Sequence, residues 1–168
     1  MIKNVKKLLL ARVFCAVIAL FALNLFSFVF SNKFIFVIFT ALVMLIYMFY
    51  ISSIAFENGA KDKRYNRVKP FKAVCESLIS EIPAALLLVW LLLSRSSFDV
   101  AGFFYDLWQA PFWLLLSVDN VIFNLEKVTP LHFLVLFFIP VLYSVSYLVG
   151  VKTTKLLTPA ETNKELKG

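Results

Sequence analysis

Two long apolar stretches at the start of the chain constrain its fold more than any other feature. Residues 8–30 and 34–56 each run for 23 residues, and the only charged side chain in either is Arg12. A helix rises about 1.5 Å per residue, so each stretch can cross the roughly 30 Å hydrocarbon core of a bilayer. Because only three polar residues separate the stretches, the sequence predicts an antiparallel pair of transmembrane helices.

The composition supports a membrane protein. Of the 168 residues, 61% are hydrophobic and 16% are charged, and the mean hydropathy is +0.86. A soluble domain is nearer half apolar and a quarter charged. The net charge of +7 lies mostly outside the apolar stretches, which is typical of membrane topology signals. We therefore expect an all-α integral membrane protein in the lipid bilayer, with no nucleic-acid partner.

Two more spans are expected further along the chain, at about 73–94 and 129–151. The first reaches spanning length only if the helix begins near Phe71 or Ala73. The second opens with Thr129-Pro130, a helix cap followed by the residue best tolerated at the first helical position. The sequence thus predicts a four-helix bundle forming a single transmembrane domain over residues 1–168.

The segment between these two spans, about 98–126, is rich in aromatic residues but is interrupted by polar ones. Its continuous apolar part is too short to cross a membrane. We expect an external segment, either interfacial helices on the membrane or a shallow re-entrant helix packed on the bundle. Trp108 and Trp113 are then expected among the lipid headgroups.

The positions of lysine and arginine predict the orientation. With four spans, fourteen of these residues fall on one side of the membrane and three fall on the other, namely Lys33, Arg95 and Lys127. Basic residues concentrate on the cytoplasmic side. We therefore expect both termini, including a polar tail at 152–168, to be cytoplasmic.

A set of residues forms a pattern around the second and third predicted spans and at the end of the last one: Tyr50, Gly59, Asp62, Asn66, Val68, Lys72, Glu81-Ile82-Pro83 and Tyr147 to Lys152. In this pattern the sequence resembles an uncharacterised family of small multi-span membrane proteins of Gram-positive bacteria. The resemblance implies a bacterial cytoplasmic membrane setting and no catalytic role.

Glu81 is the most informative candidate site residue. It lies inside the third span, two residues before Pro83, and an ionisable residue within a span is by default a candidate functional group. One interpretation is that Glu81 binds a cation or proton. The other, which we favour, is that Glu81 and Glu76 neutralise the helix dipole and pair with a basic residue, Lys72 or Arg12. Arg12 itself is expected to extend to the cytoplasmic headgroups.

Two other features suggest contact surfaces. One is a basic segment, whose residues are Lys61, Lys63, Arg64, Arg67, Lys69 and Lys72. Three interpretations of it are open: it sets the membrane topology, it binds anionic lipid, or it docks an acidic partner. Ala11, Cys15 and Ala19 form a stripe of small residues that lets a helix approach closely, either within the bundle or from a partner chain.

The sequence contains one histidine and no recognisable metal, nucleophile or phosphate-loop motif. We therefore expect a non-enzymatic protein with no cofactor, no bound metal and no catalytic residues. The predicted function is an accessory or scaffold subunit that binds another membrane protein or forms a homo-oligomer. The alternative is a small transporter, channel or substrate-binding membrane subunit that uses Glu81.

Overall fold

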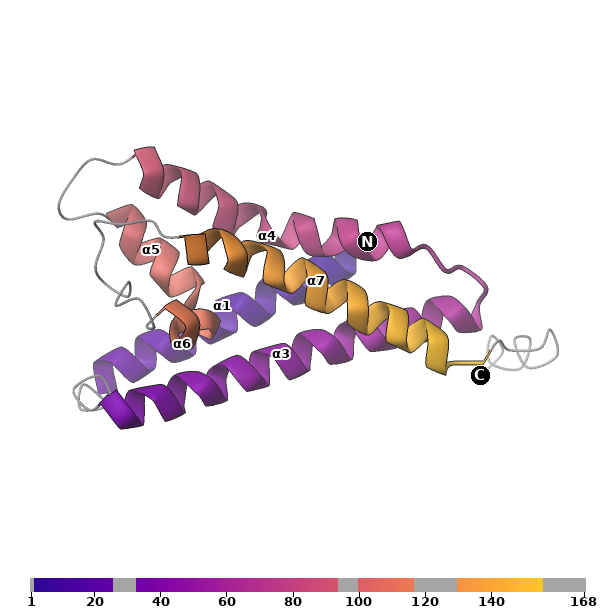
Figure 1. The fold of residues 1–168 in the computed structure, drawn as a ribbon, viewed down its shortest axis with the longest axis horizontal. Coiled ribbons are helices and arrows are strands. Elements are labelled where there is room, and N and C mark those ends of the chain that lie inside the picture. Colours follow the sequence, from indigo (N-terminus) through magenta and orange to yellow (C-terminus); the bar gives the residue numbers. More distant parts are fainter. Residues whose placement is uncertain (1, 26–32, 94–99, 117–129, 156–168) are drawn as a thin grey trace.

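The computed structural model describes residues 2–25, 33–93, 100–116 and 130–155, and these ranges are helical with no strand. The long helices run along the molecule and the short elements lie at one end of it (Figure 1). In chain order the elements are α1 (Ile2–Leu25), α3 (Lys33–Arg64), α4 (Pro70–Leu93), α5 (Val100–Trp108), η1 (Ala110–Phe112), α6 (Trp113–Leu116) and α7 (Pro130–Thr153). The prediction of an all-α chain is confirmed.

Three of the described helices are long and apolar enough to cross a membrane: α3, α4 and α7. They correspond to the spans predicted at 34–56, 73–94 and 129–151. Helix α1 covers most of the first predicted span but carries four basic residues in its first half: Lys3, Lys6, Lys7 and Arg12. The remaining parts of the predicted segments lie outside the described residues, at 26–30, 94, 98–99, 117–126, 129 and 156–168.

Helix α3 is longer than the apolar stretch that predicts it, because the helix continues through the first part of the basic segment. Asn66 ends this continuation with a φ of 51°, a left-handed conformation that asparagine tolerates. The Arg67 amide donates to the Asp62 carbonyl (2.8 Å), and the Asn66 amide donates to the Lys63 carbonyl (3.1 Å). These two bonds form a Schellman motif. The connection between α3 and α4 is therefore a tight turn at residues 65–69.

Helices α3 and α7 pack with their backbones in close contact, and two glycines make this possible. A Cβ atom at Gly59 of α3 would overlap the carbonyl oxygen of Tyr147 of α7. Likewise, a Cβ atom at Gly150 of α7 would overlap the carbonyl oxygen of Phe56 of α3. Small residues at helix crossings are typical of membrane proteins, where close packing drives association.

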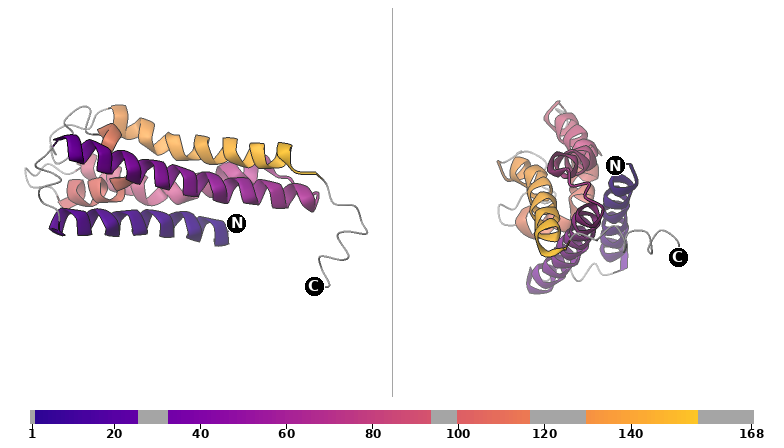
Figure 2. Two further views of the ribbon diagram at one scale, coloured as in Figure 1. Left: turned by 90° about the horizontal axis from the view of Figure 1, so that it is seen from below. Right: turned by 90° about the vertical axis from the view of Figure 1, so that its right-hand side faces the viewer.

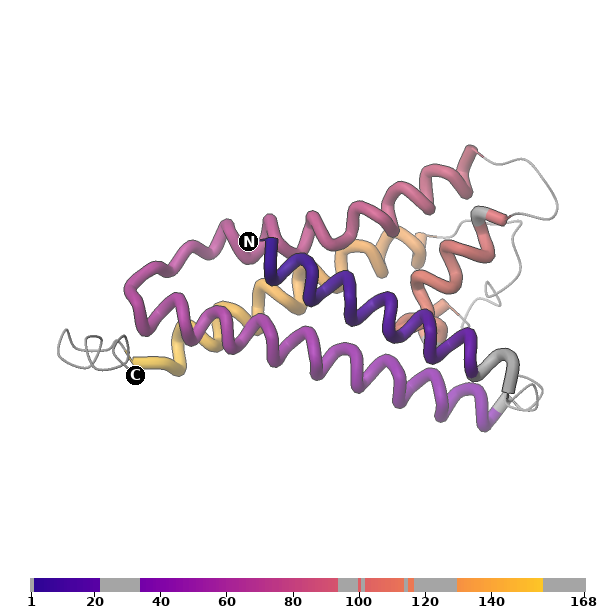
Figure 3. The backbone as a smooth tube through the Cα atoms, turned by 180° about the vertical axis from the view of Figure 1, so that it is seen from behind, coloured from indigo at the N-terminus to yellow at the C-terminus, as the bar shows by residue number. Residues whose placement is uncertain are grey.

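The short elements α5, η1 and α6 pack between the long helices at the end opposite the α3–α4 turn (Figures 1 and 3). The side chains of Tyr105, Phe112, Trp113 and Leu116 are at most 1% exposed. The Trp113 indole donates to the Asp106 carbonyl at 2.6 Å, which satisfies its N–H inside the protein. The expectation that Trp113 lies among the headgroups is therefore wrong. Trp108 is half-buried.

Candidate functional site: a buried arginine–glutamate pair

Arg12 and Glu81 meet in the interior of the protein. Arg12 lies near the middle of α1, and Glu81 lies near the middle of α4. The two residues are 1% and 5% exposed. The guanidinium Nη2 of Arg12 lies 2.5 Å from each carboxylate oxygen of Glu81. The two helices are therefore joined by a buried ion pair.

The remaining donors of Arg12 contact two further elements. Its Nε donates to the Tyr47 hydroxyl of α3 (2.9 Å), and its Nη1 donates to Oε1 of Gln109, just before η1 (3.2 Å). The guanidinium also lies over the rings of Tyr47 and Phe112, with its central carbon 5.9 and 5.8 Å from the ring centroids. All three guanidinium nitrogens thus have partners, as a charge buried away from water requires.

The network continues from Gln109 to α7. The Gln109 amide donates to the Tyr105 hydroxyl (3.5 Å), which in turn donates to the backbone carbonyl of His132 (3.4 Å). The Tyr105 and His132 rings lie 5.4 Å apart. Each of the long helices therefore contributes to one polar cluster in the interior.

A second polar cluster is centred on Glu76, toward the α3–α4 turn. One oxygen of Glu76 accepts hydrogen bonds from Asn4 of α1 (3.0 Å) and from the Tyr143 hydroxyl of α7 (3.2 Å). The Tyr143 hydroxyl also accepts a bond from Asn58 of α3 (3.0 Å). Glu76 thus links α4 to two other helices.

A third group of polar contacts joins the α3–α4 turn to α7. The Tyr147 hydroxyl donates to Asp62 (2.8 Å) and accepts from the backbone amide of Lys69 (3.3 Å). Lys72 pairs with Asp62 at 3.5 Å. Tyr147 therefore holds the turn against α7, one helical turn beyond Tyr143.

The structure decides between the predicted partners of Glu81. It pairs with Arg12, whereas Lys72 pairs with Asp62. The expected extension of Arg12 to the headgroups is wrong. Because α1 begins at Ile2, Arg12 lies two to three helical turns inside the helix. There the guanidinium donates hydrogen bonds to Glu81 and Gln109. Pro83 is half-buried within α4, two residues after Glu81.

The two predicted contact surfaces differ in exposure. The stripe of small residues, Ala11, Cys15 and Ala19, is buried in the core, so it packs within the protein. In the basic segment most side chains are exposed and two are half-buried. The exposed ones are Lys61, Arg64, Arg67 and Lys69, and the half-buried ones are Lys63 and Lys72.

Sequence reasoning missed several members of the polar clusters: Tyr47, Asn58, Gln109, Tyr143 and Tyr147. Gln109 carries a usable signal, because an amide inside an aromatic-rich segment needs a polar partner when the segment is buried. The tyrosines carry no such signal, since a tyrosine in an apolar span is as consistent with a lipid-facing position as with a buried polar cluster.

Comparison with protein-family models, with curated proteins and with solved structures gives no match for this chain. The resemblance to small membrane proteins of Gram-positive bacteria therefore stays a prediction. Within the described ranges, no group of three or more His, Cys, Asp or Glu side chains is placed to hold a metal ion.

Proposed function

We propose that this chain is a small non-enzymatic protein of the bacterial cytoplasmic membrane that acts as an accessory or scaffold subunit of a membrane complex. In this proposal α1 is a fourth span beside α3, α4 and α7, and the segment around η1 is re-entrant. The proposed partner is another membrane protein or a second copy of the chain.

The directions of the helices support this topology. Helices α1 and α3 run antiparallel (Figure 2), so the N-terminal end of α1 points toward the same end of the molecule as the α3–α4 turn and the end of α7. Lys3, Lys6 and Lys7, the basic segment and Lys152 all lie toward this end. Such a concentration of positive charge is typical of the cytoplasmic side.

The observation that carries the proposed function is the complete engagement of Glu81 by Arg12. A carboxylate that binds a solute or ion needs a coordination position that the solute can reach. Both Glu81 oxygens instead contact the guanidinium, and the residue is 5% exposed. The pair thus joins helices, which is a structural role suited to a scaffold.

One observation favours the alternative of a small transporter. Three carboxylates follow one another from the α3–α4 turn toward the middle of the protein, the half-buried Asp62 and then the buried Glu76 and Glu81, each hydrogen-bonded to a neighbouring helix. Rows of carboxylates inside membrane proteins mark ion or proton pathways. The test must therefore separate the two functions.

The test is a pull-down of the tagged full chain from its native membrane in mild detergent, with co-eluting proteins identified by mass spectrometry. We expect a partner in a fixed stoichiometry, or a defined homo-oligomer. Recovery of a homogeneous monomer alone would contradict the proposal.

Reconstitution of the purified chain into vesicles provides the second arm. The scaffold proposal predicts no ion or solute flux above that of empty vesicles. Flux in the wild type and in the exposed-residue control Glu57→Gln would establish the transporter instead, and its loss in Glu81→Gln protein that remains folded would assign the pathway to Glu81.

A further inference from the structure

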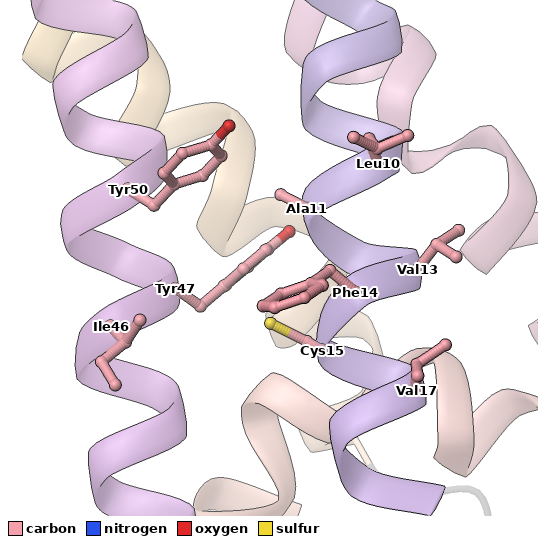
Figure 4. A pocket seen from close by; sticks show the side chains of 9 residues that line it. All are labelled: Leu10, Ala11, Val13, Phe14, Cys15, Val17, Ile46, Tyr47 and Tyr50. Carbon is pink, nitrogen blue, oxygen red and sulfur yellow. The ribbon is translucent and has the colours of Figure 1, made fainter.

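A cavity of about 450 Å³ lies between α1 and α3. Its walls are apolar side chains of α1 from Leu10 to Val17, together with Ile46, Tyr47 and Tyr50 of α3 (Figure 4). Leu10 and Ile46 are 71% and 67% exposed, so the cavity opens on the outer surface of the protein. In a membrane, this surface faces the lipid.

The cavity has a positively charged end. Lys6 and Lys7 are exposed on α1, one turn before Leu10. Residues three and four apart lie on the same face of a helix, so both lysines continue the face that Leu10 and Phe14 present to the cavity. Tyr50, which is half-exposed, lies at the same end on α3 (Figure 4). The site thus combines an apolar chamber with two cationic groups and a hydroxyl at its mouth.

We propose that this cavity binds an anionic phospholipid, with one acyl chain between α1 and α3 and the headgroup phosphate at Lys6 and Lys7. The apolar walls fit an acyl chain, and the two lysines complement a negative headgroup. A partner helix fits poorly, because a helix is 10–12 Å across and about one turn of it already fills this volume.

The position of the acyl chain connects this site to the buried pair. Tyr47 forms part of the cavity wall, and its hydroxyl accepts the hydrogen bond from Arg12 Nε. A bound chain packs against the residue whose hydroxyl accepts a hydrogen bond from Arg12. The lipid therefore supports the attachment of α1, which has few other contacts with α3.

Native mass spectrometry of the full chain in mild detergent tests the charge part of the proposal. The probes are phosphatidylglycerol and phosphatidylcholine with identical chains. We expect wild-type protein to prefer phosphatidylglycerol. Lys6→Gln/Lys7→Gln should bind it about 30-fold more weakly, since each basic residue contributes about 1 kcal/mol and 1.4 kcal/mol corresponds to tenfold.

Lys152→Gln/Lys155→Gln is the matched control, because it removes two exposed charges at the end of α7. This variant should keep the wild-type preference. Equal losses in the two double variants, or no preference in the wild type, would overturn the proposal.

Photocrosslinking tests whether the acyl chain lies in the cavity between α1 and α3. The probe is phosphatidylglycerol with a diazirine at mid-chain, in vesicles containing the full chain. We expect labelling at residues 10–17 and 46–50, reduced at least fivefold in Ile46→Trp, which fills the exposed rim of the cavity. Labelling spread evenly over the lipid-facing helices, or unchanged in Ile46→Trp, would overturn the proposal.

Discussion

Helices α7 and α1 both pack against α3, but they are attached in different ways. At Gly59 and Gly150 the backbones of α3 and α7 touch. Between α3 and α1 there is instead a cavity, and Arg12 of α1 contacts Tyr47 of α3 through a hydrogen bond to the hydroxyl and through the ring. Helix α1 is joined to α4 by the ion pair with Glu81 and by the bond from Asn4 to Glu76, and its small residues Ala11, Cys15 and Ala19 pack in the core.

The comparison shows two solutions to one physical problem. Apolar surface gains little by leaving lipid for protein, so helices in a membrane associate through close packing or through polar contacts. Helix α7 uses small residues and close packing. Helix α1 combines a buried stripe of small residues with a buried charge, the ion pair of Arg12 with Glu81. The two attachments should therefore fail under different substitutions.

Breaking the ion pair that joins α1 to α4 should cause the largest loss of stability. Arg12→Met leaves Glu81 buried without its partner, and we expect a loss of about 3–5 kcal/mol of stability. Thermal unfolding in detergent measures the loss, and the maleimide reactivity of Cys15, which is 7% exposed, reports detachment of α1 once the second free cysteine is removed by Cys75→Ser. Lys3→Met, at an exposed position on the same helix, is the control and should change neither. Unchanged Cys15 reactivity in Arg12→Met would count against this attachment.

Breaking the close packing should have the next largest effect. Gly150→Val places side-chain atoms where the Phe56 carbonyl lies, so α3 and α7 must separate. Overpacking typically costs about 1–3 kcal/mol. Unfolding should be measured beside Ala85→Val, which adds the same kind of bulk at an exposed position of α4. Similar stability of the two variants would mean that the glycines are not required for packing. Cys15 should stay unreactive toward maleimide in both variants, because α1 remains attached.

The smallest loss of stability is expected for a polar contact of α7. Helix α7 also makes hydrogen bonds near the α3–α4 turn, and the contrast with α1 requires that they contribute less than the ion pair. Tyr143→Phe removes the hydroxyl that joins Asn58 to Glu76. A lost buried hydrogen bond costs about 1–3 kcal/mol, and we expect the lower end because Asn4 still donates to Glu76. Tyr50→Phe, at a half-exposed position, should leave the unfolding midpoint unchanged. A Tyr143→Phe loss as large as that of Arg12→Met would remove the contrast between the helices.

The sequence predicts the helices well and the contacts between them poorly. Hydrophobic length predicts α3, α4 and α7, because a membrane span must satisfy its backbone within one helix. The extension of α3 to Arg64 was missed because charged residues can continue a helix beyond the membrane. The burial of Trp113 was missed because aromatic residues suit both a headgroup region and a protein core.

The candidate site was predicted in part. Glu81 and Arg12 stand out because charges within apolar stretches are rare. Their pairing was one of two alternatives, since spacing along separate helices does not fix which residues meet. Gln109 and Tyr47 complete the site from elements whose placement depends on the whole fold.

A double-substitution cycle at Arg12 and Glu81 tests the central claim most directly. The two single variants, Arg12→Met and Glu81→Met, and the double variant are compared by reversible unfolding in detergent. A structural ion pair predicts that each single variant loses about 3–5 kcal/mol, and that the double variant loses clearly less than the sum of the two losses, because no unpaired charge remains buried. A loss in the double variant equal to the sum of the single losses would contradict the claim that this pair holds α1 to the protein.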